Sequence, residues 1–356
     1  MELPSINIIF KNKANTAIER GERGIVALVL KDAVPSTNPF VVKNENDIID
    51  GLADANKEQI KLALIGGENP PKKVIVYVVP ADAADFSTAL NYLETVKFDY
   101  LAIPDVDKTD AIVTWIKQLR DDKDIKVKVV LPHTAADYEG VINFDTDNIA
   151  AFGKTYTTAK YCSRIAGLLA GTPLKMSATY SVLSEVEDVP HLTKDDGDKA
   201  VSEGKLIIIN DGEKCKIGRA VNSLTTIDTN KGEDFKKILI VDKSDMWHDD
   251  VKRTVGDFYL GKYPNNYDNK ILLISAIQAY NDQLVLEGLL DGSLADYNKV
   301  SIDISAQEDY LKSIGEDTGS MKEQQIKEAN TKDKVFLMSN LKWTDAMEDF
   351  NINVII

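Results

Sequence analysis

KVIVYVVP at residues 73–80, YLAIP at 100–104 and VKVVLP at 127–132 are the three stretches that decide the fold class. Each is a short, mainly apolar run, which is typical of a strand buried on both faces of a sheet. Between them, residues 82–96 and 107–121 carry apolar side chains at helical spacing. Strands that alternate with helices over short connections predict a parallel sheet with right-handed crossovers, and therefore an α/β fold.

The chain beyond these stretches continues the pattern. Residues 141–144 offer a fourth strand, and residues 157–169 predict a helix. That helix ends at Gly171 and Pro173, the usual order of a helix stop. Gly167 and Gly171 lie four residues apart on one helix face, so we expect them to line a close contact, with Gly171 also ending the helix.

The second half of the chain differs in character, with a hairpin and two long helices. The hairpin signal is Asp211-Gly212, and a domain boundary is expected near residues 225–232. The predicted elements are hairpin strands at 205–210 and 216–221, helices at 233–260 and 267–290, a strand near 300–304, two modest helices and a strand at 335–343.

Composition limits the function classes. The chain has 356 residues, and 42 Lys and Arg against 57 Asp and Glu give a formal net charge of −15. At roughly 150 residues per domain, this length favours two domains. The acidity argues against general nucleic-acid or anionic-membrane binding, because both need clustered positive charge. No run predicts a signal peptide or a membrane span, and Cys162 and Cys215 are too few for a disulfide framework, so we expect reduced thiols in a cytosolic product.

Both ends of the chain have the pattern of a strand. LPSINIIF at residues 3–10 and NINVII at 351–356 place apolar side chains on one side at period two. Each end could pair within its own domain, or it could be lent to a neighbouring subunit, because a free end is easily added to an exposed sheet edge. The apolar side chains in question are Ile6, Ile8, Phe10, Ile352, Val354 and Ile356.

Nucleophilic catalysis is the first chemistry to weigh. Asp105 and His133 follow two of the predicted strands, at the strand ends where α/β sheets place their sites, and Ser177 is a conceivable third member of a triad. The sequence has no G-x-S-x-G elbow, D-[ST]-G, H-G-[TS] or G-T-S-M-A motif. This favours a loop histidine and a helix-capping aspartate; a cytosolic α/β hydrolase that uses His133 and Asp105 is the alternative.

Metal and phosphate sites are poorly supported, so no metal or cofactor is expected. Residues 105–116 begin like a calcium loop, but the sixth position is Asp110 and the twelfth is Ile116. Residues 242–250 combine four aspartates with His248, which without a second histidine predicts a solvated acidic helix segment. The glycines and lysines of residues 66–73 lack the spacing of a phosphate-binding loop and predict a turn.

Lysines gather on a predicted helix near residues 320–330, where Lys322 and Lys327 alternate with Glu323 and Glu328. A solvated face is the default interpretation of such a mixed helix. In a chain of net charge −15, a lysine-bearing surface is also a candidate docking place for an acidic partner.

Seven segments carry a family resemblance through their shared order. They are LPSINI (3–8), RGIVA (23–27), RIAGLLAGTPLKMSATY (164–180), RAVNSLT (219–225), YDNK (267–270), IKEANT (326–331) and DAMED (345–349). Together they resemble the contractile tail sheath family of phages and phage-tail-like bacteriocins, especially the short sheath subunits of Gram-positive hosts. AGTP followed by a GRAVNSLT-like strand is the most specific part.

The resemblance implies an α/β, subtilisin-like parallel-sheet domain without a catalytic triad, and an α+β C-terminal domain that faces a rigid inner tube. It implies the boundaries 1–20 for an N-terminal arm, 21–228 for the α/β domain, 229–345 for the C-terminal domain and 346–356 for a C-terminal arm. The two arms would join a sheet in adjacent subunits, so Ile6, Ile8, Phe10, Ile352, Val354 and Ile356 are the expected intersubunit residues.

The implied function is that of a structural subunit, not an enzyme, which polymerises helically around an inner tail tube and contracts to drive that tube through the target cell envelope. Expected partners are further copies of the chain, the tube protein, and baseplate and tail terminator proteins, without nucleic acid or membrane insertion. Assembly would take place in the host cytoplasm, and Lys322 and Lys327 are the residues expected to face the tube. The resemblance leaves open the helical symmetry, and whether the particle is a DNA-carrying phage or a headless bacteriocin.

Overall fold

The computed structural model describes residues 17–229 and 231–355, which form two compact units. The first, termed the α/β unit, comprises residues 21–229, 231–246 and 345–355; the second, termed the helical unit, comprises residues 17–20 and 247–344. One boundary lies inside helix α6 (Ile238–Phe258), whereas the sequence places it in the preceding linker. The first part of α6, residues 238–246, belongs to the α/β unit, and Ile238 packs in the core of that unit. Within the described parts, no helix is long and apolar enough to cross a membrane.

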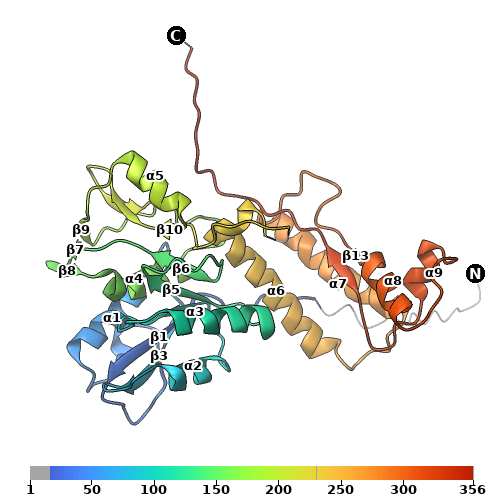
Figure 1. The fold of residues 1–356 in the computed structure, drawn as a ribbon, viewed down its shortest axis with the longest axis horizontal. Helices are drawn as coiled ribbons and strands as arrows, with labels where there is room; N and C mark the ends of the chain where they lie inside the picture. The colour runs from blue at the N-terminus through green and yellow to red at the C-terminus, as the bar shows by residue number, and fades with distance from the viewer. Residues whose placement is uncertain (1–16, 230, 356) are drawn as a thin grey trace, which may run out of the picture. The chain divides into compact units, whose positions relative to one another are not determined.

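A seven-stranded sheet is the centre of the α/β unit (Figure 1). Its order is β10-β6-β5-β4-β1-β3-β2, and every neighbouring pair is parallel except β2 with β3. The predicted parallel sheet is therefore confirmed, with β1 inserted between β3 and β4. The strands are β1 (Ile25–Asp32), β2 (Phe40–Val42), β3 (Lys73–Pro80), β4 (Tyr100–Ala102), β5 (Lys128–Pro132), β6 (Val141–Phe144) and β10 (Lys205–Leu206).

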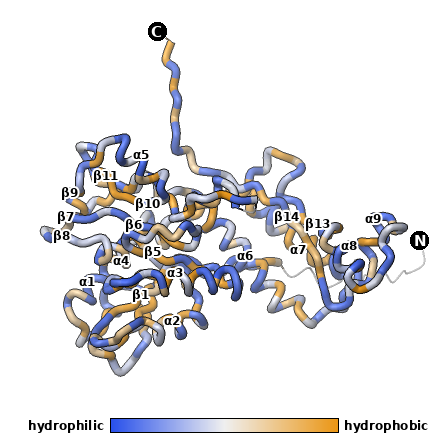
Figure 2. Tube along the Cα trace, viewed as in Figure 1, coloured by the Kyte–Doolittle hydropathy of each residue, from blue (hydrophilic) through white to orange (hydrophobic). Residues whose placement is uncertain are grey.

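Strand β1 explains why the runs are apolar without alternation. Val26, Leu28 and Leu30 join one hydrophobic core, while Ile25 and Val29 join a second core on the other face. Successive side chains of a strand point to opposite faces, so both faces need apolar residues when helices cover both. Figure 2 shows the hydrophobic colouring along β1 and β5.

Two pairs of helices cover the two faces of the sheet. Helices α1 (Asp54–Ile65) and α4 (Thr158–Ala170) contribute to the core that contains Val26. Helices α2 (Ser87–Leu93) and α3 (Asp110–Lys117) contribute to the other core. The α/β unit is thus a three-layer arrangement around the sheet.

The predicted close contact at Gly167 is confirmed. A Cβ atom there would lie 2.0 Å from the backbone oxygen of Ala63 on α1, and one at Gly171 would lie 1.9 Å from the backbone oxygen of Asn69. These distances are too short for any side chain, so α4 approaches α1 and its following turn only because both positions are glycine.

The segment 205–210, which the sequence predicts as one strand, is split. Residues 205–206 form β10 of the main sheet, whereas β11 (Ile208–Asn210) pairs with β12 (Cys215–Ile217) in the hairpin predicted at Asp211-Gly212. The split occurs at Ile207, whose carbonyl accepts a hydrogen bond from the amide of Gly218 at 2.8 Å. Nearby elements that the sequence analysis did not specify are α5 (Lys194–Ser202) and a sheet of β7 (Ile149–Ala151), β8 (Lys154–Tyr156) and β9 (Val186–Asp188).

The helical unit contains the second part of α6 together with three helices and a small antiparallel sheet. These are α7 (Tyr267–Leu286), α8 (Ile304–Ser313), α9 (Glu323–Glu328), β13 (Val300–Ile302) and β14 (Leu337–Ser339). The indole of Trp247 donates to Asn281 Oδ1 at 2.8 Å, and the hydroxyl of Tyr280 donates to Asp250 Oδ2 at 2.6 Å, so polar pairs join α6 to α7. The strand predicted at 335–343 is shorter, because only residues 337–339 pair with β13.

Candidate functional site

His133 and Asp105, the residues of the hydrolase alternative, follow β5 and β4 as the sequence predicts, but they belong to separate polar groups. Nδ1 of His133 contacts Asp145, and its Nε2 lies 3.3 Å from Asp147 Oδ2. Asp105 pairs with Lys160 of α4. A general base needs one ring nitrogen directed at the nucleophile and the other at its orienting group. Both nitrogens of His133 face carboxylates, so this geometry is not that of a triad.

The other candidate nucleophiles are equally unsuited. The hydroxyl of Ser177 donates to Thr179 Oγ1 at 2.8 Å. Burial raises the pKa of the Cys162 thiol and that of Cys215, which keeps both thiols protonated and unreactive. Within the described residues, no three His, Cys, Asp or Glu side chains are placed to hold a metal ion.

The acidic segment of α6 is buried, so the prediction of a solvated helix face was wrong. Asp242, Asp245 and Asp250 are all buried. Asp242 and Asp245 lie one turn apart and therefore share one face of the helix. Cations of the α/β unit face both carboxylates, which is the usual condition for burying charge.

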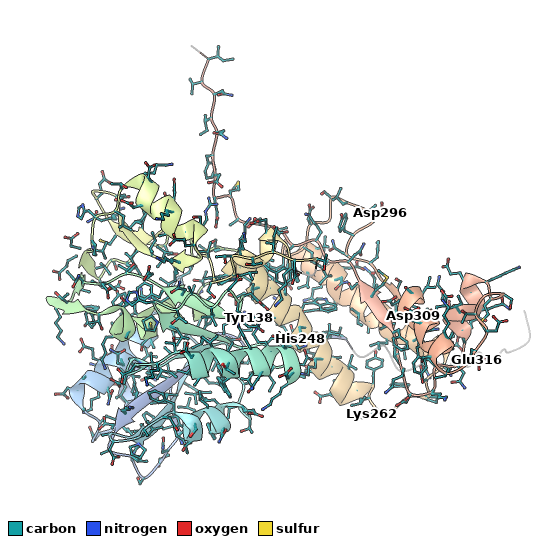
Figure 3. All side chains as sticks on the ribbon, viewed as in Figure 1. Tyr138, His248, Lys262, Asp296, Asp309 and Glu316 are labelled. Atoms are coloured by element: carbon teal, nitrogen blue, oxygen red, sulfur yellow. The ribbon has the colours of Figure 1, made fainter. Side chains whose placement is uncertain are left out.

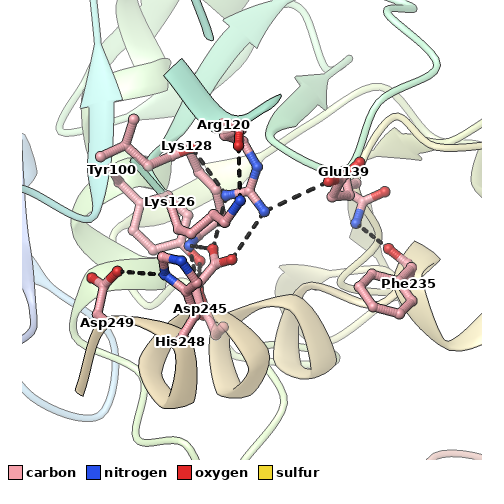
Figure 4. Close-up of polar contacts among 12 residues, drawn as sticks. Tyr100, Arg120, Lys126, Lys128, Glu139, Phe235, Asp245, His248 and Asp249 are labelled. Atoms are coloured by element: carbon pink, nitrogen blue, oxygen red, sulfur yellow. Dashed lines mark hydrogen bonds and ion pairs between the residues drawn. The ribbon is translucent and has the colours of Figure 1, made fainter. Parts of the chain in front are cut away.

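Lys128 on β5 is the central cation of this group, and its side chain is buried. Its Nζ lies 2.7 Å from Asp245 Oδ2 and 3.0 Å from Asp242 Oδ1. The ammonium group also lies 5.0 Å from the centre of the Tyr100 ring. One lysine thus links the middle of the sheet to Asp245 of α6 (Figure 4) and also to Asp242.

Arg120 is the second buried cation. It lies in a π-helical turn (Gln118–Asp122) that continues α3, and it holds Asp245 with two hydrogen bonds of 2.9 Å. Its Nη2 also lies 3.6 Å from Glu139 Oε1. This bidentate geometry fixes the direction of both side chains and is stronger than a single charged hydrogen bond.

Arg23 and Tyr100 complete the group around Asp242. Nη1 of Arg23 donates to the backbone oxygen of Asp242 at 3.0 Å, and its Nη2 lies 3.7 Å from the carboxylate. The hydroxyl of Tyr100 lies 2.8 Å from both carboxylate oxygens. We call Arg23, Arg120, Lys128, Glu139, Asp242 and Asp245 the buried ionic cluster.

Mutual pairing governs the protonation of this cluster. Burial alone would raise the pKa of Asp245, but the charges of Arg120 and Lys128 outweigh it and hold that pKa well below its usual range. Burial would likewise lower the pKa of Lys128, yet Asp245 and Asp242 raise it. Asp245 and Lys128 therefore both stay charged at neutral pH, and neither is available to exchange a proton in catalysis.

The cluster has a structural role. Three cations face three carboxylates, and together they come from β5, the π-helical turn, the residues before β1, the residues before β6, and α6. Removing one member of such a group leaves a buried charge uncompensated, which disfavours any alternative placement of α6. One signal in the sequence pointed to it: Lys128 is a charged residue inside a strand buried on both faces, which requires a buried counter-charge.

The C-terminal segment begins as an anchored root, residues 345–349. Lys237 pairs with Asp345, Arg219 Nη2 lies 2.6 Å from Asp349 Oδ1, and Arg219 Nε lies 3.5 Å from Glu348 Oε2. All five residues belong to the α/β unit. The last residues of the chain are thus tied to this unit by charge.

The segment that follows, residues 350–355, has exposed side chains and forms no strand in the structure. Figure 2 colours the trace of this segment by hydropathy. Phe350 is 68 % exposed, Ile352 79 % and Val354 76 %. Exposed apolar side chains at period two are typical of a strand that lacks its partner. Of the predicted intersubunit residues, Ile6, Ile8, Phe10 and Ile356 lie outside the described residues.

Among the described residues, no strand pairs with the outer edge of β14 in the small sheet of the helical unit. Ser301 lies opposite Met338, and the amide of Asp303 donates to the carbonyl of Phe336 at 3.0 Å. Hydrogen-bonded pairs alternate along an antiparallel ladder, so the backbone groups of Leu337 and Ser339 point away from β13. The outer edge of β14 therefore presents backbone groups that a further strand could pair.

Lys322 and Lys327, the predicted tube-facing residues, lie at α9. Lys322 is the N-cap residue and is exposed, whereas Lys327 pairs with Glu323 at 2.6 Å. Asp309 and Glu316, at and just beyond α8, are exposed acidic residues of the same unit (Figure 3). The surface is mixed in charge.

Two family models cover most of the chain. The phage tail sheath protein central domain matches residues 80–223, and the phage tail sheath C-terminal domain matches residues 230–356. The tail sheath protein of Clostridium phage phiCD119 is 40% identical over 359 residues, which is 99% of this chain and 99% of that protein.

Solved structures share the fold. The sheath tail protein from Desulfitobacterium hafniense has a TM-score of 0.71 at 20% identity, covering 85% of this chain and 94% of that one. The helical sheath of the anti-feeding prophage in its contracted state has a TM-score of 0.71 at 14% identity, covering 100% and 99%. The chain therefore belongs to the phage tail sheath protein family, as a structural subunit of a contractile tail and not as an enzyme.

Proposed function

We propose that the two chain ends of this sheath subunit are arms donated as strands to neighbouring subunits of a helical polymer. The observation that carries the proposal is the C-terminal segment, whose apolar side chains Ile352 and Val354 are exposed while its root is anchored. Ile356 continues the period-two pattern of Ile352 and Val354, and Ile6, Ile8 and Phe10 have the same pattern at the N-terminal end of the chain.

The outer edge of β14 is the acceptor that we propose for a donated arm. A two-stranded sheet is only marginally stable by itself, and an added strand extends its ladder and covers one apolar face. Met338 is half exposed on β14, which supplies an apolar contact for an arriving Ile or Val side chain.

Such contacts join different surfaces of identical subunits, and they generate an open helix when the rotation from one subunit to the next does not close into a ring. We infer a helical homopolymer around an inner tail tube, with baseplate and tail terminator proteins at its ends and no nucleic acid or membrane insertion. Because each arm is anchored only at its root, subunits can rotate while the strand pairing between them is kept. This property suits a contraction that drives the tube through an envelope. Assembly in the host cytoplasm and residence in the tail of a phage or phage-like particle follow from this role.

The α/β unit is, in our proposal, a subtilisin-like domain that serves as a rigid body and has no catalysis. The paired state of both His133 nitrogens and the ion pair of Asp105 support this view. The α9 surface around Lys322 and Lys327 is our candidate for contact with the tube. Its exposure and its lysines support that assignment within a chain of net charge −15.

Deletion of residues 1–12 tests the arm proposal. The truncated chain should give the circular dichroism spectrum of the full chain but sediment as a soluble monomer at concentrations where the full chain forms sheaths. Sheaths of normal length from the truncated chain, seen by negative-stain electron microscopy, would remove the N-terminal arm from the account.

A further inference from the structure

We propose that Arg219 is the positioning residue of the C-terminal arm, because it holds the root at residues 345–349 and fixes the point where the arm leaves the α/β unit. This proposal rests on the proposed function and adds to it a residue that lies outside both arms. The arm itself supplies the strand; Arg219 determines where that strand starts.

The contacts of Arg219 support this role. Its guanidinium meets two consecutive carboxylates, with Asp349 at 2.6 Å and Glu348 at 3.5 Å. The side chain of Glu348 is only 12% exposed, whereas that of Asp349 is 80% exposed. The same arginine thus binds one mostly buried carboxylate and one mostly exposed carboxylate of the root.

The backbone that bears Arg219 is held firmly. The preceding Gly218 donates to the carbonyl of Ile207 at 2.8 Å, and the following Ala220 donates to Thr179 Oγ1 at 2.9 Å. An arginine on a fixed backbone loses less freedom on pairing than one on a mobile loop, so the contact is preorganised.

Two lysines extend the same charge pattern along the root. Lys237 pairs with Asp345, and the charge of Asp345 opposes the effect of burial on the pKa of Lys243. The pKa of Asp349 is lowered, first by its hydrogen bond with Arg219. Lys237 and Arg219 together therefore pair with all three carboxylates of the root.

The contacts of Arg219 limit how far the C-terminal arm can extend from the α/β unit. With the root held, residues 350–356 span at most about 23 Å in an extended strand. With the root released, the twelve residues from 345 span about 40 Å, and the end of the arm explores a far larger volume. A shorter, fixed tether raises the effective concentration of the arm at a neighbouring sheet edge.

The test compares three full-length variants. Arg219→Glu repels the root, Lys214→Glu makes the same charge change on the neighbouring hairpin turn, and Arg219→Glu with Asp349→Arg restores an ion pair of reversed direction. The readout is the critical concentration for sheath formation, measured by pelleting with purified tail tube present. We expect Arg219→Glu to raise it at least tenfold, Lys214→Glu to leave it unchanged, and the double variant to recover most of the loss.

A second readout does not depend on assembly. Amide hydrogen exchange of residues 346–349 should be slower than that of 350–355 in the wild type and equally fast in Arg219→Glu. Asp349→Lys, a change at an exposed residue, should have the same effect if Arg219→Glu fails to fold. Unchanged exchange and an unchanged critical concentration would overturn the assignment.

A chain truncated after Asp349 distinguishes a failure of the proposed arm function from a failure of the role assigned to Arg219. If that chain fails to assemble while Arg219→Glu assembles normally, the arm stands and the role of Arg219 is wrong. If the truncated chain assembles like the wild type, the proposed function of the C-terminal arm itself fails.

Discussion

The ammonium group of Lys128 on β5 lies 2.7 Å from the carboxylate of Asp245 on α6, and both side chains are buried. This pair connects the centre of the sheet to the helix that runs from the α/β unit into the helical unit. Together with the two hydrogen bonds from Arg120 to Asp245, this pair fixes how the first part of α6 is held against the sheet of the α/β unit.

Asp245→Asn should destabilise the α/β unit strongly. The substitution leaves Lys128 and Arg120 buried beside a neutral amide, and the loss of one partner of a buried ion pair costs about 3–5 kcal/mol. Urea unfolding followed by circular dichroism measures this change. Asp309→Asn on the exposed surface of α8 is the control and should lower the free energy of unfolding by less than about 0.5 kcal/mol. Equal effects of the two variants would contradict the structural role of the cluster.

Lys243 should give the stability of the chain a distinctive pH dependence. Burial lowers its pKa from the usual 10.5 to about 8, against the opposing charge of Asp345. Between these two values the unfolded chain binds the extra proton, so the free energy of unfolding gains a contribution that rises with pH. Lys243→Met should therefore be more stable than the wild type at pH 7, with a difference that shrinks towards pH 10. A difference independent of pH would show that Lys243 titrates normally.

Gly167→Ala should weaken the packing of α4 against α1. Its Cβ would lie 2.0 Å from the backbone oxygen of Ala63, so the helices must separate, which costs at least about 1–3 kcal/mol. Gly256→Ala on α6 is the matched control, because nothing lies within 4 Å of its Cβ. That change should stabilise the helix by up to about 1 kcal/mol, and thermal unfolding of both variants measures the contrast. A tolerated alanine at position 167 would count against the close approach.

Lys322→Glu combined with Lys327→Glu should uncouple the sheath from its tube without affecting self-assembly. The change reverses two charges on α9, a surface that takes no part in the proposed arm contact. Lys194→Glu with Lys199→Glu, on the exposed α5 of the other unit, is the control. Co-sedimentation of sheath with purified tube measures binding. Unaltered binding would remove α9 from the tube interface.

The parallel sheet could be predicted from sequence because its strands are buried on both faces and therefore form continuous apolar runs. Strand β1, for example, contributes side chains to two separate hydrophobic cores. The glycine contact at Gly167 could also be predicted, since spacing on one helix face is a local property. The burial of Asp242 and Asp245 could not, because it depends on Arg120 and Lys128, which are more than 100 residues away in the chain.

The apolar pattern of the C-terminal arm could be predicted from the sequence, but the anchoring of its root could not. The period-two pattern of Ile352 and Val354 is visible in the sequence, and the structure adds that both are exposed. The anchoring of the root by Arg219 was not predictable, because 130 residues separate the two partners and no local pattern pairs them.

The central claim is that one apolar face of the C-terminal arm joins a neighbour's sheet. Ile352→Asp with Val354→Asp places two charges on that face, and Asn351→Asp with Asn353→Asp places two on the opposite face of the same strand. Electron microscopy of both full-length variants with tail tube present tests the claim most directly. We expect sheathed tubes from the Asn351 and Asn353 variant, and bare tubes with monomeric subunit from the Ile352 and Val354 variant. Normal sheaths from both variants would contradict it.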